Sequence, residues 1–300
     1  MFKNIDPLIK LSDNEKSEFD KLIKKERKTH IKPPKNTTHN AVKENKETIE
    51  KLLKVNNVSQ CINVLRELSY EEFLKEEALF NGLILSTISE KFKIPKLMLQ
   101  NISDQLHTHK NLSKDDFFQM TSQLFGEYAG SISPYIYQLN LSNTQSRRSR
   151  AGKTFEGIIY YLYEYYGYQY DAQSTIGKKA FSELNLGKVV DSILPNKQAF
   201  IDHRTKTIVG SMKTTLRERW QEVVEEISRS NLPNIYLLTV DDNISESKVL
   251  QMAQHNIILV VLKEVKEKPQ LKTKQSVIDF ETYFLKEIPI IMNYWELQNV

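Results

Sequence analysis

Apolar residues recur at helical spacing through the first 140 residues of the chain. Phe73, Phe80 and Leu83 illustrate the spacing, since residues three or four apart share one face of a helix. The pattern predicts helices over residues 14–27, 42–54, 61–92 with a break near Ser69, and 114–128. Between the first two helices, residues 30–39 contain Pro33-Pro34, which is typical of a linker or hinge.

From about residue 145, a long helix over 146–166 is followed by short apolar runs that alternate with amphipathic segments. Continuous apolar runs such as 235–240 and 257–262 are typical of buried strands. Further strands are expected at 168–173, 188–194, 199–203 and 207–212, and helices at 216–229, 245–254 and within 276–295. The order predicts an α/β fold, a mixed central β-sheet flanked by helices, over 145–300, after a largely helical region over 1–144.

Composition narrows the class of protein. At 40% hydrophobic and 27% charged residues, the chain is typical of a folded globular protein. No apolar run approaches the roughly 20 residues that span a bilayer, and the first residues lack the apolar core of a secretory signal, so no membrane partner and a cytoplasmic location are expected. One cysteine and six scattered histidines give no zinc site, so any metal is expected to be hard and held by oxygen, most simply Mg²⁺.

The net charge of +4 is unevenly distributed. Residues 1–54 hold 14 lysines and arginines against 9 acidic residues, and the rest of the chain is close to neutral. A dense local exception consists of Arg147, Arg148, Arg150 and Lys153. These groups are compatible with a polyanionic partner but do not require one.

An acid and a lysine on neighbouring strands are the first candidates for chemistry. Lys213 ends a predicted strand, 22 residues after Asp191 on the preceding hairpin. In metal nucleases such a carboxylate binds a divalent cation, while the ammonium helps to stabilise charge on a phosphate. A second acid often lies two residues before the lysine, but here that residue is Ser211. Spacing alone also fits a surface lysine at a strand end.

Helical geometry indicates a substitute for the missing acid. At about 100° per residue, the apolar residues of the following helix form one stripe that must face the sheet. Of the four glutamates on this helix, Glu226 lies nearest to the stripe, whereas Glu218, Glu222 and Glu225 point further toward solvent. A third acid, Glu156, lies near the start of the long helix and can point toward the strands.

In combination, these motifs resemble the EcoRII and SsoII group of type II restriction endonucleases, a branch of the PD-(D/E)xK nucleases in which the second acid lies on the helix. The resemblance covers about residues 145–265. It is carried by Ser-x-Lys at 211–213, Arg-Glu-Arg-Trp at 217–220, an acid 13 residues beyond the lysine, and Arg-Ala-Gly-x-x-Phe-Glu at 150–156. One departure is Val190, where the family pattern has proline before the aspartate.

The resemblance implies a Mg²⁺-dependent homodimer that cuts duplex DNA at a short palindrome containing CC and GG, encoded beside a cognate DNA methyltransferase. Asp191 would be the central metal ligand, Lys213 the catalytic lysine, Glu226 the displaced acid and second metal ligand, and Glu156 a supporting carboxylate. Region 145–300 would be catalytic. Region 1–144 carries no motif of this family, and four roles are open for it: contact with DNA, contact with the dimer partner, a regulatory arm, or a helical layer that covers the sheet.

The resemblance also implies how DNA is read. Arg217, Glu218 and Arg219 would read C·G pairs, because arginine donates to guanine O6 and N7 and glutamate accepts from cytosine N4. The basic residues before Glu156 would meet phosphates: Arg147, Arg148, Arg150 and Lys153.

Other readings remain open on the sequence. A non-catalytic DNA-binding protein would keep the Arg-Glu-Arg helix without cleavage. A repair or recombination nuclease of the same fold would recognise DNA structure rather than sequence. The tyrosine-rich segment 160–170 fits core packing better than a platform for stacked bases.

Overall fold

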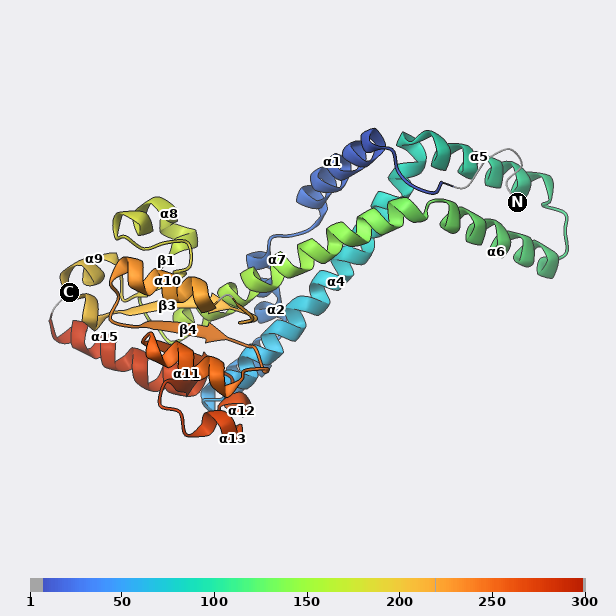
Figure 1. Ribbon diagram of the computed structural model, residues 1–300. Coiled ribbons are helices and arrows are strands. Elements are labelled where there is room, and N and C mark those ends of the chain that lie inside the picture. The colour runs from blue at the N-terminus through green and yellow to red at the C-terminus, as the bar shows by residue number, and fades with distance from the viewer. Residues whose placement is uncertain (1–7, 219, 299–300) are drawn as a thin grey trace. The chain divides into compact units, whose positions relative to one another are not determined.

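A computed structural model describes residues 8–218 and 220–298 of the chain (Figure 1). The chain forms two compact units, each made from two segments. One, the helical unit, consists of Met1–Pro33 and Glu71–Ser149, and the other, the sheet unit, consists of Pro34–Tyr70 and Arg150–Val300. Two long helices, α4 (Val58–Lys91) and α7 (Ser133–Tyr165), contribute residues to both units.

The helical unit contains α1 (Asp13–His30), α5 (Lys93–Thr108) and α6 (Lys114–Ser131), with parts of α4 and α7. Ser12 begins α1 with a reciprocal capping box to Glu15, which satisfies otherwise unpaired N–H groups. The aromatic rings of Phe19, Phe92 and Tyr135 form its core, with ring centroids 5.0–6.0 Å apart.

The sheet unit is built on six strands in sequence order. They are β1 (Asp171–Ala172), β2 (Ser192–Leu194), β3 (Ile208–Lys213), β4 (Ile235–Thr239), β5 (Ile257–Val261) and β6 (Val277–Asp279). β1, β2 and β3 pair antiparallel, and β3 to β6 pair parallel. The predicted mixed sheet flanked by helices is therefore confirmed.

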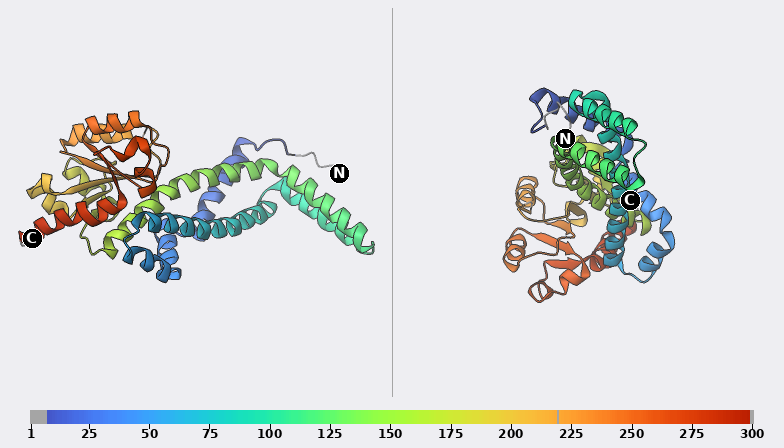
Figure 2. Two further views of the ribbon diagram at one scale, coloured as in Figure 1. Left: turned by 90° about the horizontal axis from the view of Figure 1, so that it is seen from below. Right: turned by 90° about the vertical axis from the view of Figure 1, so that its right-hand side faces the viewer.

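Helices cover both faces of this sheet. The crossovers from β3 to β6 contain α10 (Trp220–Ser230), α11 (Glu246–Gln254), α12 (Lys263–Lys266) and α13 (Pro269–Lys272). Parallel crossovers are right-handed, so these helices share one face. The opposite face is covered by the end of α7, α14 (Phe280–Thr282), the π-helical turn Tyr283–Glu287 and α15 (Ile288–Leu297), as Figure 2 shows for the sheet unit.

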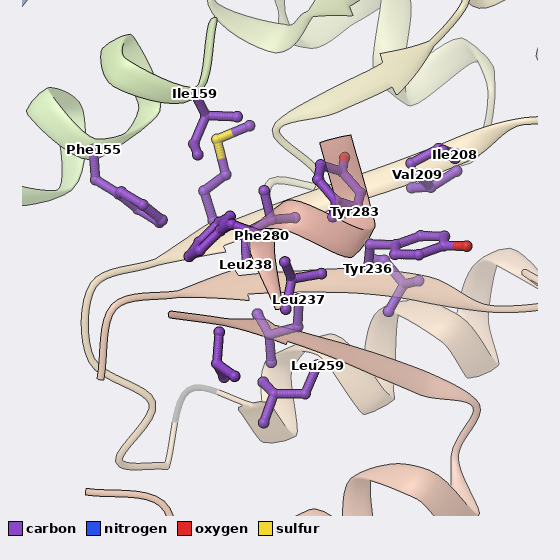
Figure 3. Packing of buried hydrophobic residues seen from close by; sticks show 14 of the residues in the cluster. Phe155, Ile159, Ile208, Val209, Tyr236, Leu237, Leu238, Leu259, Phe280 and Tyr283 are labelled. Carbon is purple, nitrogen blue, oxygen red and sulfur yellow. The ribbon is translucent and has the colours of Figure 1, made fainter. Parts of the chain in front are cut away.

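The core lies on both faces of the sheet, and Figure 3 shows part of it, including residues packed against the second helical layer. Phe155 and Phe280 meet edge to face with ring centroids 6.3 Å apart, and the hydroxyls of Tyr163 and Tyr283 share a buried hydrogen bond of 2.8 Å. The tyrosine-rich segment thus packs into the core, which supports the packing interpretation of that segment.

Four short helices and a turn complete the sheet unit: α2 (Pro34–Glu44), α3 (Lys46–Lys54), α8 (Gln173–Glu183), α9 (Lys197–Asp202) and the 3-10 turn Arg204–Lys206. The expected boundary at residue 144 differs from the division in the structure, because residues 34–70 lie in the sheet unit. Ile49, Leu53 and Ile62 from this segment join the core of that unit.

Several expected elements differ from the structure. The strand expected over 199–203 is wrong, because residues 199–202 lie in α9, where the Asn196 side chain accepts a hydrogen bond from the Ala199 N–H and begins the helix. Residues 277–279 form strand β6 rather than helix. Residues 34–39 belong to α2 rather than a loop, since proline fits the first helical turn. The break expected near Ser69 is wrong because α4 is continuous there.

None of the helices in the described part of the chain combines the length and apolar character that a membrane crossing requires.

Candidate active site

Asp191 and Lys213 meet at the point where β2 begins and β3 ends. The antiparallel register pairs Ser192 with Gly210, and the Asp191 N–H donates to the Gly210 carbonyl at 2.8 Å. Asp191 Oδ2 accepts from the Met212 N–H at 2.7 Å and lies 3.5 Å from Lys213 Nζ. Both side chains are only 13% exposed. The hairpin therefore places the predicted acid and the predicted lysine together.

The segment Gly187–Asp191, here called the Asp191 turn, is held through its backbone. The Ser211 hydroxyl donates to the Val189 carbonyl at 2.7 Å. The Gln173 side-chain amide donates to the carbonyls of Gly187 and Val190 at 3.1 and 3.0 Å. The Asp191 carbonyl accepts from the Tyr160 hydroxyl and from the Gln173 N–H, both at 3.0 Å. Side chains from three elements thus fix the turn that leads to Asp191.

Glu226 on α10 also holds the Asp191 turn. Its side chain is 3% exposed, whereas Glu218, Glu222 and Glu225 are exposed, in agreement with the helical stripe. The carboxylate accepts from the Gly187 N–H at 2.7 Å, from Arg229 at 2.7 Å and from the Ser230 hydroxyl at 2.6 Å. Its hydrogen bonds and ion pair in the structure thus go to these groups rather than to Asp191 or Lys213.

Glu156 on α7 supplies a second carboxylate near Asp191. Lys153 Nζ donates to both Glu156 oxygens, at 2.9 and 2.7 Å, and the Glu156 side chain is 13% exposed. The Glu156 charge is close enough to raise the pKa of both Asp191 and Tyr160. Two acids and two lysines therefore lie around the end of β3.

Burial dominates the electrostatics of Asp191. Removal from water raises the pKa of Asp191 to about 6; the Lys213 ammonium opposes this shift, and the Glu156 charge adds to it. The Met212 N–H and the Lys153 ammonium lower the pKa by smaller amounts. An additional positive charge beside this carboxylate would stabilise its ionised form.

The donor set fits a hard divalent cation. Both candidate ligands are carboxylates, and Asp191 Oδ1 accepts no hydrogen bond from the described residues, so it is free to bind. Within residues 8–218 and 220–298, however, no three His, Cys, Asp or Glu side chains are grouped as a metal site. The oxygen ligands beyond Asp191 and Glu156 would have to include water, backbone or DNA.

The predicted DNA-reading residues lie between β3 and α10. Arg217 and Glu218 are exposed, and Arg217 has a φ of 35°, in the left-handed region. Arg219 lies outside the described residues. A groove beside this segment is lined by Arg217, Glu218, Trp220, Gln221, Ser245, Ser247, Lys248 and Gln251.

The basic cluster before Glu156 is not uniform. Arg147 forms a bidentate ion pair with the buried Glu77, which compensates its charge within the helical unit. In the sheet unit, Arg150 donates to the Thr37 hydroxyl at 3.0 Å. Arg148 is exposed, and Lys153 pairs with Glu156.

Sequence reasoning missed the residues that hold the Asp191 turn. Gln173, Tyr160 and Gly187 carry no motif, and their role arises only when the fold joins distant segments. Ser211 gave a partial signal, since it occupies the position where related nucleases have an acid.

Comparison with known proteins finds relatives that match most of the chain. Residues 115–284 match the family model described as EcoRII C terminal. The chain is 33% identical over 267 residues to the type II restriction enzyme SsoII of Shigella sonnei, covering 88% of this chain and 79% of the relative.

Solved structures agree. Metal-depleted Ecl18kI in complex with uncleaved DNA is 30% identical, with a TM-score of 0.71 over 95% of this chain and 86% of that one. Its complex with uncleaved, modified DNA gives a TM-score of 0.72 at 30% identity, over 93% and 85%. The PspGI–substrate DNA complex, at 18% identity and a TM-score of 0.57 over 88% and 94%, is similar in fold.

The contact between Gly187 and Glu226 predicts a steric requirement for glycine. A Cβ at position 187 would collide with the Glu226 carboxylate and the Arg229 guanidinium. We expect Gly187→Ala to lower the free energy of unfolding by about 1–3 kcal/mol, measured by urea denaturation. Gly126→Ala, at a helical position with open space, is the control and should be neutral or stabilising. If adding Glu226→Ala does not reduce the cost of Gly187→Ala, the contact is not its cause.

The raised pKa of Asp191 predicts a pH-dependent stability cost. Because the folded pKa of about 6 exceeds 3.8, the ordinary value for an aspartate, the native state binds this proton more tightly than the unfolded chain. Protonated Asp191 therefore contributes to the stability of the folded protein below about pH 4, and this contribution to the free energy of unfolding is lost as the pH rises to about 6. In chelator, Asp191→Asn should be more stable than wild type above pH 6 by about 2–3 kcal/mol.

The measurement is thermal or urea unfolding of both proteins between pH 4 and 8. The values near pH 4 serve as the internal reference, because in the folded protein both side chains are neutral there. A stability difference that stays constant across this range would contradict the assignment.

Proposed function

Because the chain belongs to the EcoRII and SsoII group of type II restriction endonucleases, we propose that it hydrolyses duplex DNA at a short palindrome containing CC and GG, with Mg²⁺ as cofactor. The chain is a type II site-specific deoxyribonuclease. The observation that carries the proposal is the pairing of Asp191 with Lys213 at 3.5 Å at the end of two adjacent strands. The recognition core is CCGG, or carries a central base as in CCNGG or CCWGG.

Asp191 would hold the cation through its free Oδ1, with Glu156 as the supporting carboxylate. Glu226 is proposed as a further ligand: its bonds to Gly187, Arg229 and Ser230 all go to Oε1, so Oε2 is the oxygen that would bind the cation. When bound, Mg²⁺ supplies Lewis-acid polarisation of the scissile phosphate and lowers the pKa of an attacking water.

Lys213 would stabilise the negative charge that develops on the phosphate. Its side chain is 13% exposed and its ammonium is held at the end of β3 beside Asp191, so it would meet the phosphate with little competing water. Lys153, on the other side of Glu156, is 60% exposed and is placed to contact the DNA backbone.

Sequence would be read by Arg217, Glu218 and Arg219 through C·G base pairs. Arg147, Arg148 and Arg150 are proposed to lie near phosphates, with the exposed Arg148 the most available of the three. A palindromic site calls for two copies related by a two-fold axis, so we propose a homodimer. The host DNA then requires protection by a cognate methyltransferase.

Cleavage of unmethylated plasmid DNA in Mg²⁺ tests the activity. We expect discrete fragments from wild type, and a rate lower by about 10²–10³-fold in Lys213→Met, which removes a charge at the phosphate while keeping the length of the side chain. Lys197→Met is the matched control, because Lys197 pairs with Glu183 at 3.1 Å on another part of the sheet unit. Mapping the cut ends gives the recognition sequence.

Absence of cleavage on any unmethylated DNA, or full activity in Lys213→Met, would contradict the proposed activity. Cutting of branched DNA without sequence preference would instead indicate a repair or recombination nuclease. DNA binding that is salt-dependent, unaffected by Asp191→Asn and never accompanied by cutting would indicate a non-catalytic DNA-binding protein.

Substitution of two arginines tests the proposed base-reading and phosphate-contacting roles separately. Arg217→Ala should lose about 1–3 kcal/mol of discrimination between the cognate duplex and one with a substituted C·G pair. Arg148→Ala should weaken binding to both duplexes equally and reduce the salt slope by about one. Binding is measured by fluorescence anisotropy in Ca²⁺ at several salt concentrations. Equal effects of the two substitutions on both duplexes would refute the assigned roles.

A further inference from the structure

We propose that Gln173 is a positioning residue that fixes Asp191 for cation binding. This inference rests on the proposed function, because it concerns the metal site of the same reaction. Gln173 is the first residue of α8, directly after β1, and its side chain is half-buried.

Three hydrogen bonds join Gln173 to the Asp191 turn. Its side-chain Nε2 donates to the Gly187 carbonyl at 3.1 Å and to the Val190 carbonyl at 3.0 Å, and its backbone N–H donates to the Asp191 carbonyl at 3.0 Å. One residue therefore spans the turn from its first peptide group to its last.

The Val190 carbonyl depends on this contact. Val190 is fully buried, and its carbonyl accepts no other hydrogen bond from the described residues. Loss of the Gln173 amide would leave this oxygen unpaired, at a cost that favours a change in the turn.

Asp191 lies one residue before the β2 ladder, so the sheet holds it on one side only. The Asp191 N–H bonds to Gly210 in β3, while the carbonyl faces Gln173 and Tyr160. A shift of the peptide group between Val190 and Asp191 would rotate the carboxylate away from Lys213 and Glu156. Cation affinity depends on the groups that position a metal ligand: mutation of a residue that hydrogen-bonds to a ligand typically lowers metal affinity by about 10–100-fold.

The test compares Gln173→Met with wild type. Methionine keeps the length of the side chain and removes both donors, and Gln198→Met is the matched control, because Gln198 donates to Asp202 on the exposed surface of α9. Mn²⁺ is the probe, and its free concentration is followed by electron paramagnetic resonance during titration of the full chain.

We expect the Mn²⁺ Kd to rise about tenfold in Gln173→Met and to stay unchanged in Gln198→Met. The Mg²⁺ concentration for half-maximal cleavage should rise by the same factor, with the rate at saturating Mg²⁺ within about twofold of wild type. DNA affinity in chelator should not change, because Gln173 lies outside the proposed DNA-reading segment. If Gln173 served only folding, its substitution would lower thermal stability without raising the Mn²⁺ Kd while leaving the rate at saturating Mg²⁺ and the DNA affinity unchanged.

A Mn²⁺ Kd within twofold of wild type in Gln173→Met would overturn the role of Gln173. If that variant does not fold, Gln173→Leu removes the donors without adding a charge, and the same criterion applies. Failure of wild type itself to bind Mn²⁺ would reject the proposed metal-dependent function, an outcome distinct from failure of Gln173 alone.

Discussion

The antiparallel pairing of β2 with β3 is the constraint on which the candidate site depends. Asp191 lies just outside that ladder, and its backbone N–H and one carboxylate oxygen bond to Gly210 and Met212 of β3. The same strand ends in Lys213, so a single register sets both groups. Residues from α7, α8 and α10 then hold the turn that precedes Asp191, which limits its freedom from the other side.

The site concentrates charge that the net charge of the chain does not reveal. Asp191 and Glu156 lie with Lys213 and Lys153, and these four charges cancel when summed. Burial nevertheless raises the pKa of Asp191 to about 6, so the ionised carboxylate is held at an energetic cost to the folded protein. The same burial supports the proposed affinity for a cation. A carboxylate with little contact with water is stabilised more by a nearby positive charge than a solvated one.

The sequence predicted those parts of the fold whose signal is local. The apolar runs of β4 and β5 and the stripe of α10 correspond to the structure, and the glutamate predicted to lie nearest to the stripe, Glu226, is the buried one. The wrong predictions concern segments whose secondary structure is set by a capping or tertiary contact. α9 depends on its cap, and the edge strand β6 depends on pairing with β5. Asp191 and Lys213 could be paired from sequence because a hairpin joins them. Gln173 could not, since its hydrogen bonds need β1 and α8 to be in place.

One continuous segment links the residues proposed to read bases to the proposed metal site. Lys213 is the last residue of β3, and the Leu216 N–H after it donates to the Asp241 carboxylate at 2.8 Å. Arg217 and Glu218 come next, shortly before the start of α10. Further along the same helix, Glu226 bonds to the Gly187 N–H in the turn that leads to Asp191. A displacement of α10 by DNA at its first turn would therefore reach Asp191 through Glu226 as well as Lys213 through β3. The residues proposed for recognition and those proposed for cleavage are thus connected through α10 and the segment that leads into it.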